Sequence, residues 1–363
     1  MTATEKTTEI RIFPPPGACM AIGSLPHTDV ERALDLVLEA CPDAPCWPQL
    51  PALGFQENMM AQFSEGFPCI VIDREGKRLY FKDPQDNVDE VTQFYEKYLS
   101  AEASGSLDAF ALSPSYAQGL HAFSRRISKE GSRHYSILKG QITGPLTFGL
   151  SVLDEHGAPA FFNDTLADVI QKGIVMKARW QILHLRQLCR QVIMFVDEPI
   201  LAGFGSAAFI NVSRNDVISH LGEAFSALKE TGCIVGSHCC GNTDWSLLVE
   251  AGVDIINFDA CAYLDTICLY PEALHSFFSR GGFLAWGIVP STHLDRRPDE
   301  SELFDRLMRG ANTLSEIGLS KELVLERLLL TPSCGLGTLK EQEAEGILAE
   351  LTRLSSRVKG LLT

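Results

Sequence analysis

The sequence lacks any run of apolar residues long enough to cross a membrane. Its longest apolar runs are of strand length, far short of the roughly 20 residues that a membrane-spanning helix needs. The N-terminus also lacks the apolar core of a secretory signal, and Pro14, Pro15 and Pro16 interrupt it. We therefore expect a cytoplasmic protein without a membrane partner.

Basic residues are in short supply. Lys and Arg total 31 against 46 Asp and Glu, which gives a net charge of −15, and no run rich in Lys and Arg occurs. Nucleic acids and anionic membrane surfaces attract basic patches and repel an acidic chain. We therefore expect no nucleic-acid partner.

Fingerprints of several common enzyme classes are also absent. The sequence contains no G-x-S-x-G, Walker or dinucleotide-binding pattern, and the segment Gly335-Leu-Gly337 is too short for a phosphate loop. Hydrolase, nucleoside triphosphatase and dehydrogenase functions are therefore unsupported.

Cysteine, by contrast, is plentiful, with eleven residues. Cysteines of a cytosolic protein are seldom in structural disulfides and are more often buried, catalytic or metal-binding. The odd number also argues against a fully paired disulfide framework.

Short apolar runs alternate with longer amphipathic segments along most of the chain. The strand-like runs lie at residues 110–112, 135–138, 192–196, 233–235, 255–258, 283–286 and 328–330. The helix-like segments lie at residues 163–190, 214–230, 243–250, 270–280, 299–316 and 339–357. This alternation is typical of βα units around a parallel sheet.

Two earlier strands complete the predicted sheet. One covers residues 19–22 and leads to a helix that the capping box Thr28-x-x-Glu31 would open, and the other lies near residues 44–50. The count reaches eight or nine, which predicts an α/β fold built as a single (β/α)₈ TIM barrel. We assign residues 1–16 to an N-terminal extension and residues 17–363 to the barrel.

Residues 66–82 interrupt the alternation. Residues 69–73 and 78–81 have the composition of two strands, and Arg74-Glu-Gly-Lys77 joins them. We predict a small β-hairpin insertion that packs outside the barrel.

Reactive side chains gather where the predicted strands end. They are Asp197, Glu198, His238, Cys240, Asp259 and Cys334. The carboxyl ends of the strands form the active face of a parallel barrel. The sequence therefore predicts one site that contains these side chains.

Part of this set suits a metal ion. His238 and Cys240 are two residues apart, so at a strand end their side chains point to the same side, whereas Cys239 points away. Taken singly, a cysteine here is more often a small buried hydrophobe and an aspartate a helix N-cap. A tetrahedral Zn²⁺ site needs one or two more donors, which Cys334 and Asp259 are placed to supply.

The motifs that carry a family resemblance follow one another along nearly the whole chain. They are Ile22-Gly-Ser-Leu-Pro-His-Thr28, Gln141-Ile-Thr-Gly-Pro-Leu-Thr147, Val196-Asp-Glu-Pro199, His238-x-Cys240, Asp254-Ile-Ile-Asn-Phe-Asp259 and Pro332-Ser-Cys-Gly-Leu-Gly337. This set resembles the catalytic barrel of cobalamin-independent methionine synthase. The wider superfamily also holds uroporphyrinogen decarboxylase and the methylcorrinoid:coenzyme M methyltransferases.

The resemblance implies a role for each matching position. His238, Cys240 and Cys334 match the zinc ligands, and Asp259 falls where the family has a glutamate ligand. Asp197 matches the carboxylate that holds the amino group of homocysteine. Ile22 and Ser24 match the loop that contacts the amino-acid end of this substrate. The implied reaction is methyl transfer to a zinc-activated thiol, which gives methionine.

The sequence departs from the family in three places. The family's full-length enzymes have a second, N-terminal barrel that helps to bind folate, which 363 residues do not accommodate. Glu57 lies near the family's acidic motif but out of register, and the family's late histidine is missing from residues 287–292, although His293 follows. Because the folate-binding barrel is missing, we expect a methylcorrinoid carrier protein as the methyl donor in preference to methyltetrahydrofolate. The other two departures concern the thiol acceptor.

Three further residues are candidates for the site. Glu198 would support Asp197 or its loop, and His27 in the first loop could reach the pocket. Trp286 would form a pocket wall or pack at the barrel rim.

Three alternatives remain open at this point. One is a methylcorrinoid-dependent methyltransferase whose acceptor is a thiol without an amine, such as coenzyme M. Another is a decarboxylase of the uroporphyrinogen type, although the Arg-rich N-terminal signature expected of it is not found. The third is a non-catalytic protein, either structural or a corrinoid-binding partner that docks without methyl transfer, whose zinc site is closed by four protein ligands.

Overall fold

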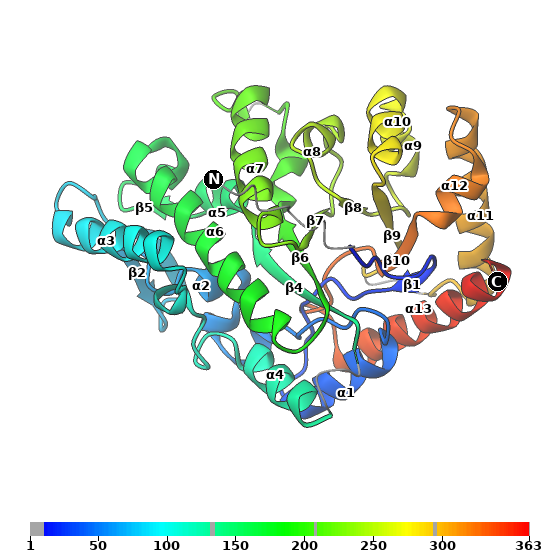
Figure 1. Cartoon of the computed structure of the whole chain (residues 1–363), viewed down its shortest axis with the longest axis horizontal. Helices are drawn as coiled ribbons and strands as arrows, with labels where there is room; N and C mark the ends of the chain where they lie inside the picture. The colour runs from blue at the N-terminus through cyan, green and yellow to red at the C-terminus, as the bar shows by residue number, and fades with distance from the viewer. Residues whose placement is uncertain (1–10, 131–134, 207–208, 293–295, 363) are drawn as a thin grey trace, which may run out of the picture.

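We analysed a computed structural model of the chain, which describes residues 11–130, 135–206, 209–292 and 296–362 (Figure 1). Its centre is a seven-stranded parallel sheet with helices around its outer side (Figure 1). In spatial order the strands are β1 (Ala18–Cys19), β10 (Leu328–Pro332), β9 (Phe283–Val289), β8 (Ile255–Phe258), β7 (Ile234–Cys239), β6 (Gln191–Asp197) and β4 (Ile137–Thr143). The α/β class and the parallel sheet agree with the prediction from sequence.

The eighth strand predicted near residues 44–50 is not formed as a ladder. Two isolated parallel bridges replace it, one between Cys46 and Lys139 of β4 and one between Gln49 and Ser24 beyond β1. Pro45 and Pro48 flank Cys46, and proline has no N–H to donate to a neighbouring strand. Residues 46–49 thus contact both edges of the sheet through single bridges.

The six helices predicted from periodicity are present. They are α6 (Asp164–Arg186), α7 (Arg214–Lys229), α8 (Ser246–Glu250), α10 (Pro271–Ser279), α11 (Glu300–Glu316) and α13 (Glu341–Leu362). The other α-helices are α1 (Val30–Ala40), α2 (Met59–Phe63), α3 (Val88–Ser104), α4 (Gln118–Glu130), α5 (Pro145–Ser151), α9 (Leu264–Ile267) and α12 (Lys321–Glu326). No helix among the described residues is both long enough and apolar enough to span a bilayer.

Two local predictions were wrong. Helix α1 is capped by Asp29, whose side chain accepts hydrogen bonds from the N–H groups of Glu31 and Arg32, so Thr28 does not open a capping box. Residues 110–112 do not form a strand, because the chain turns through a short 3-10 helix at Asp108–Phe110.

The hairpin predicted within residues 66–82 is present outside the main sheet. Strands β2 (Ile70–Asp73) and β3 (Arg78–Phe81) are antiparallel, and the short strand β5 (Leu153–Asp154) pairs with β3 in parallel. Helix α3 follows the hairpin along the chain and precedes β5 (Figure 1).

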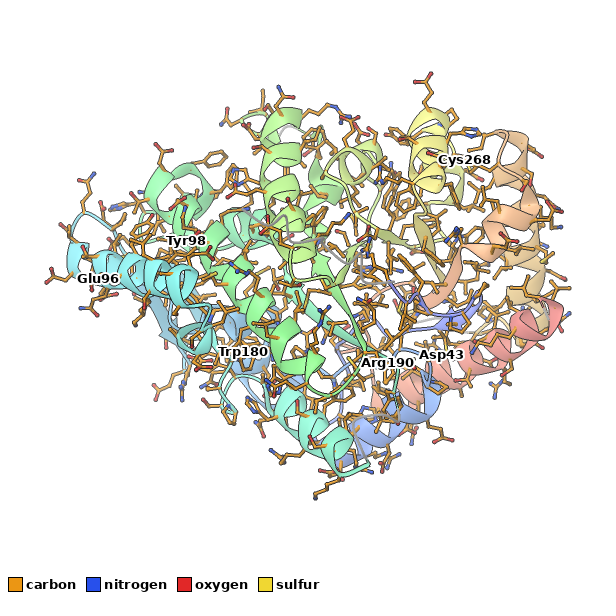
Figure 2. The ribbon with its side chains drawn as sticks, in the orientation of Figure 1. Asp43, Glu96, Tyr98, Trp180, Arg190 and Cys268 are labelled. Atoms are coloured by element: carbon orange, nitrogen blue, oxygen red, sulfur yellow. The ribbon has the colours of Figure 1, made fainter. Side chains whose placement is uncertain are left out.

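Buried apolar side chains form two clusters that lie on opposite sides of the main sheet. The larger cluster fills the layer between the sheet and the helices, where the side chains crowd together (Figure 2). The smaller cluster takes alternate residues from all seven strands, among them Ala18, Ile193, Ile234, Ile255 and Ala285. Since alternate residues of a strand face one side, the smaller cluster identifies the inward-facing position of every strand.

Candidate metal centre

The strand register places four polar side chains in one row at the carboxyl end of the sheet. Thr143 of β4 pairs with Asp197 of β6, Asp197 pairs with His238 of β7, and His238 pairs with Asn257 of β8. Each of these side chains faces the same side of the sheet as the residues that its strand contributes to the smaller apolar cluster. Each lies two or more positions further along its strand, toward the carboxyl end. The sheet therefore presents this row at the mouth of its curved interior.

His238, Cys240 and Cys334 come together at this mouth. One ligand atom from each, a ring nitrogen or a sulfur, lies within 4.8 Å of the others. This is the one group of three or more His, Cys, Asp or Glu side chains with such geometry in the described part of the chain. Cys240 follows β7 and Cys334 follows β10, so residues about 95 positions apart meet because their strands lie in one sheet.

The donor set fits a zinc ion. Nε2 of His238 is buried and has no hydrogen-bond partner among the described residues, which is the environment expected of a metal-ligating atom. The hydrogen bond from Cys334, together with the nearby His238, holds the pKa of Cys240 well below its usual range, which favours the thiolate form of this sulfur. Thiolate and neutral imidazole are the donors that zinc sites use most.

The other nitrogen of His238 has a defined partner. Nδ1 lies 2.5 Å from Oδ1 of Asn257, whose Nδ2 donates to the carbonyl oxygen of Ala285 and to the hydroxyl of Thr331, both at 2.7 Å. Asn257 is fully buried. The sequence analysis does not predict a role for Asn257. It lies two residues after the inward-facing Ile255 and therefore faces the same side of the sheet.

Asp259 is not part of the group of three. Its Oδ1 accepts hydrogen bonds from the backbone N–H groups of Cys261 at 2.8 Å and Ala262 at 3.1 Å. Strand β8 ends at Phe258, so Asp259 caps the turn that follows. The structure thus shows Asp259 in a capping role, which is common for an aspartate at a strand end.

A cavity of about 340 Å³ opens at His238, Cys240 and Cys334, which we call the triad. Six residues predicted for the site line it: Ile22, Ser24, Asp197, His238, Cys240 and Cys334. Glu57, Gln49, Asn58, Met59 and Thr143 also line it. The out-of-register Glu57 therefore still reaches the site.

Two glycines let the first and last loops approach each other beside Cys334. A Cβ atom at Gly335 would lie 2.3 Å from Oγ of Ser24, and one at Gly337 would lie 3.0 Å from Cβ of Ser24. The N–H of Gly337 donates to Oγ of Ser24 at 3.3 Å. These contacts explain why glycine flanks Cys334 in the sequence.

Asp197 is a buried carboxylate with unused hydrogen-bonding capacity. Its Oδ1 has no partner among the described residues. Burial raises the pKa of Asp197, and the electrostatic interactions with His238 and Lys139 act in the opposite direction. An incoming cation would satisfy Oδ1 and favour the ionised carboxylate.

Besides Asp259, three predicted site residues lie outside the cavity lining: Glu198, His27 and Trp286. Glu198 is fully buried and accepts hydrogen bonds from the N–H groups of Leu146 and Thr147 and from the Thr147 hydroxyl, so it caps α5. His27 lies 3.4 Å from Glu345 of α13. Neither side chain lines the cavity in this structure.

Trp286 faces the helices and not the cavity. Its ring packs edge to face against Phe258 at 6.1 Å, and a Cβ atom at Gly310 of α11 would lie 2.6 Å from it. Since Ala285 faces inward, the next residue, Trp286, faces the other side of the sheet. Of the two roles suggested by the sequence, the structure shows packing. His293 lies outside the described residues.

Fold and site together define an α/β protein with a parallel curled sheet and a His–Cys–Cys cluster at the carboxyl end of its strands. No protein-family model and no curated protein matches the sequence. Among solved structures, the fold is similar to that of a methyltransferase from Methanosarcina mazei, with a TM-score of 0.54, 13% sequence identity and 94% of each chain covered. At this identity the similarity establishes a TIM-barrel-like fold.

A second solved structure is a broad specificity endoglucanase from Clostridium longisporum. It is 11% identical, with a TM-score of 0.29 over 65% of this chain and 86% of the other. A similarity this low carries no argument about fold or function.

Proposed function

We propose that the protein is a zinc-dependent methyltransferase that moves a methyl group to a small thiol, with homocysteine as the thiol and methionine as the product. The observation that carries the proposal is a sulfur-rich triad that shares one cavity with the unpartnered buried carboxylate of Asp197. The resemblance to cobalamin-independent methionine synthase supports the same activity. So does the methyltransferase title of the solved structure with a similar fold.

The triad and the carboxylate have separate tasks in this proposal. His238, Cys240 and Cys334 would hold a zinc ion, which would lower the pKa of a coordinated thiol and so supply a nucleophilic thiolate at neutral pH. Asp197 accepts hydrogen bonds from the ammonium group of the amino-acid thiol and so orients its sulfur. The sulfur attacks the methyl carbon in line, and the donor leaves with the electron pair of its bond to the methyl group.

We further propose Asp259 as the ligand of the fourth position in the substrate-free protein. One carboxylate oxygen already caps the turn, so the other would have to serve as the ligand. The substrate sulfur would then replace it, which keeps four donors at the zinc throughout.

The donor in this proposal is a methylcorrinoid carrier protein, with methyltetrahydrofolate as the alternative. Methyl bound to cobalt is a better donor than methyl on a tertiary amine, so less activating machinery is needed in the acceptor protein. The carrier would dock over the cavity opening.

We also propose that residues 46–49 occupy the position of the eighth strand in a TIM barrel formed by residues 17–363. Their bridges to Ser24 and Lys139 support this, because they contact both edges of the seven-stranded sheet.

Zinc K-edge absorption with and without homocysteine tests the proposed activity. We expect a sulfur scatterer at about 2.3 Å to be gained and an oxygen to be lost when the thiol binds. A spectrum that no thiol changes would contradict thiol activation and leave a structural zinc site. Absence of zinc after anaerobic reconstitution would contradict the whole proposal.

The Asp197→Ala variant separates the two acceptor classes. We expect it to weaken homocysteine binding and to leave binding of an amine-free thiol such as coenzyme M unchanged. Full methyl transfer to homocysteine by this variant would favour an acceptor without an amine.

A further inference from the structure

The orientation of the Asn257 side chain is fixed by its surroundings. Nδ2 donates to the backbone carbonyl of Ala285 at 2.7 Å, and a carbonyl oxygen can only accept. The amide nitrogen must therefore face Ala285, and Nδ2 also donates to Thr331 at 2.7 Å. The amide oxygen is left facing Nδ1 of His238 at 2.5 Å.

This orientation determines which ring nitrogen of His238 carries the proton. The amide oxygen of Asn257 only accepts, so Nδ1 must be the donor. In a neutral imidazole the other nitrogen, Nε2, then has a free lone pair. Nε2 is also the buried atom without a hydrogen-bond partner among the described residues, and it belongs to the residue that meets Cys240 and Cys334.

The same amide also connects the two strands, β7 and β10, that carry the triad. Asn257 is the register partner of His238 on β7 and of Ala285 on β9. Its bond to Thr331 reaches β10, three residues before Cys334. A change at Asn257 would therefore alter both the ring of His238 and the strand that leads to Cys334.

We propose that Asn257 is a positioning residue for a metal ion held by His238, Cys240 and Cys334. Its amide keeps His238 protonated on Nδ1 and directs Nε2 toward the two sulfurs. This inference rests on the proposed metal-dependent function, but it concerns metal binding and not methyl transfer. Metal-bound histidines commonly donate their second N–H to such a partner, whose loss lowers metal affinity by roughly 10- to 100-fold.

Two substitutions at Asn257 test the role of the acceptor oxygen. Asn257→Leu has a similar volume without the oxygen, and we expect its zinc affinity, measured by competition with a chromophoric chelator, to fall by roughly 10- to 100-fold. Asn257→Asp retains an oxygen for Nδ1 and should restore most of the lost affinity. The d–d absorption spectrum of the Co²⁺-loaded protein should change more in Asn257→Leu than in Asn257→Asp.

A matched control lies on the same strand as His238. Ser237 is buried and donates to the carbonyl of Val196 at 2.8 Å, so Ser237→Ala removes a buried hydrogen bond without touching the ring. We expect it to lower stability and to leave zinc affinity unchanged. The inference is overturned if Asn257→Leu folds and binds zinc as tightly as the unsubstituted protein, or if Asn257→Asp loses zinc as fully as Asn257→Leu.

A measurement on the unsubstituted, metal-free protein keeps the inference testable if Asn257→Leu does not fold. Two-bond ¹H–¹⁵N correlation spectra of the nine histidines should show His238 protonated on Nδ1. Protonation on Nε2 would overturn the inference. If zinc affinity depends on Asn257 but no methyl transfer occurs, the proposed function fails while this inference stands.

Discussion

The ammonium group of Lys139 donates a hydrogen bond to the backbone carbonyl of Ile22 at 2.6 Å inside the curled sheet. The same group lies 3.3 Å from Oε1 of Gln141 and 4.6 Å from the ring centre of Phe195. Lys139 belongs to edge strand β4, whereas Ile22 lies beyond the opposite edge strand β1. This bond therefore joins the two edges at the level of residues 46–49 and holds the loop that lines the cavity.

We expect Lys139→Met to loosen this loop. The buried carbonyl of Ile22 loses a charged donor, which should lower the free energy of unfolding by about 1–3 kcal/mol. Homocysteine binding should weaken while zinc content stays the same, as measured by urea unfolding, calorimetry and metal analysis. Lys177 of α6 is also buried but packs over the Phe67 ring, so Lys177→Met should affect stability alone. Unchanged homocysteine affinity in Lys139→Met would contradict the role of the loop.

Glu57 should make stability depend on pH. Burial raises its pKa from 4.5 to about 7, although the N–H of Gln118 and the amide of Gln62 stabilise the carboxylate. Between these two values the folded protein retains a proton that the unfolded chain releases, so stability decreases as the pH rises from about 4.5 to 7. The total loss should be on the order of 3 kcal/mol.

The Glu57→Gln variant isolates this effect. Other groups titrate alike in both proteins, so the stability difference between them should change across the same pH window and be constant outside it. Urea unfolding at intervals of pH measures it. Parallel stability curves from pH 4 to 8 would show that Glu57 has an ordinary pKa.

The helices and the grouping of His238, Cys240 and Cys334 could be predicted from sequence for the same reason, which is periodicity. The 3.6-residue period located α6, α7 and α11 within a few residues, and the two-residue period of a strand placed His238 and Cys240 on one side. Both signals are local. The meeting of these two residues with Cys334 required only that their strands share one sheet.

The failures have equally local causes. Pro45 and Pro48 reduced the expected eighth strand to single bridges. The sequence allows Trp286 as a cavity wall. However, Ala285 faces inward on β9, so its neighbour Trp286 faces the helices. The sequence does not indicate a role for Lys139 or Asn257. The role of a polar residue on the inward face depends on its hydrogen-bond partners on neighbouring strands, which the local sequence does not identify.

Gly144 should be intolerant of a side chain. A Cβ atom there would lie 2.1 Å from Oε1 of Glu198, which caps α5 through its bonds to Leu146 and Thr147. Gly144→Ala should therefore displace Glu198 and lower the free energy of unfolding by about 3 kcal/mol. At Gly346 of α13 nothing lies within 4 Å of a Cβ atom, so Gly346→Ala should stabilise by roughly 0.5–1 kcal/mol. Equal effects of the two variants would contradict the contact with Glu198.

Trp286 should contribute to stability and not to ligand binding. Trp286→Phe leaves a space beside Phe258 and Gly310, which should lower the free energy of unfolding by roughly 1–2 kcal/mol. Homocysteine affinity, measured by calorimetry on the zinc-loaded protein, should not change. Ile22→Ala, which alters a residue of the cavity lining, should change it. A loss of affinity in Trp286→Phe at unchanged zinc content would place the indole at the ligand after all.

Asp259→Asn distinguishes a turn cap from a zinc ligand. The asparagine retains an oxygen for the N–H groups of Cys261 and Ala262, so the turn should keep its stability. If the second oxygen of Asp259 occupies the fourth zinc position, the substrate-free variant should lose an oxygen scatterer from the zinc K-edge spectrum. Addition of homocysteine should then make the two spectra identical, because the substrate sulfur takes that position in both proteins. Identical spectra before the thiol is added would show that Asp259 serves the turn alone and that another donor completes the site.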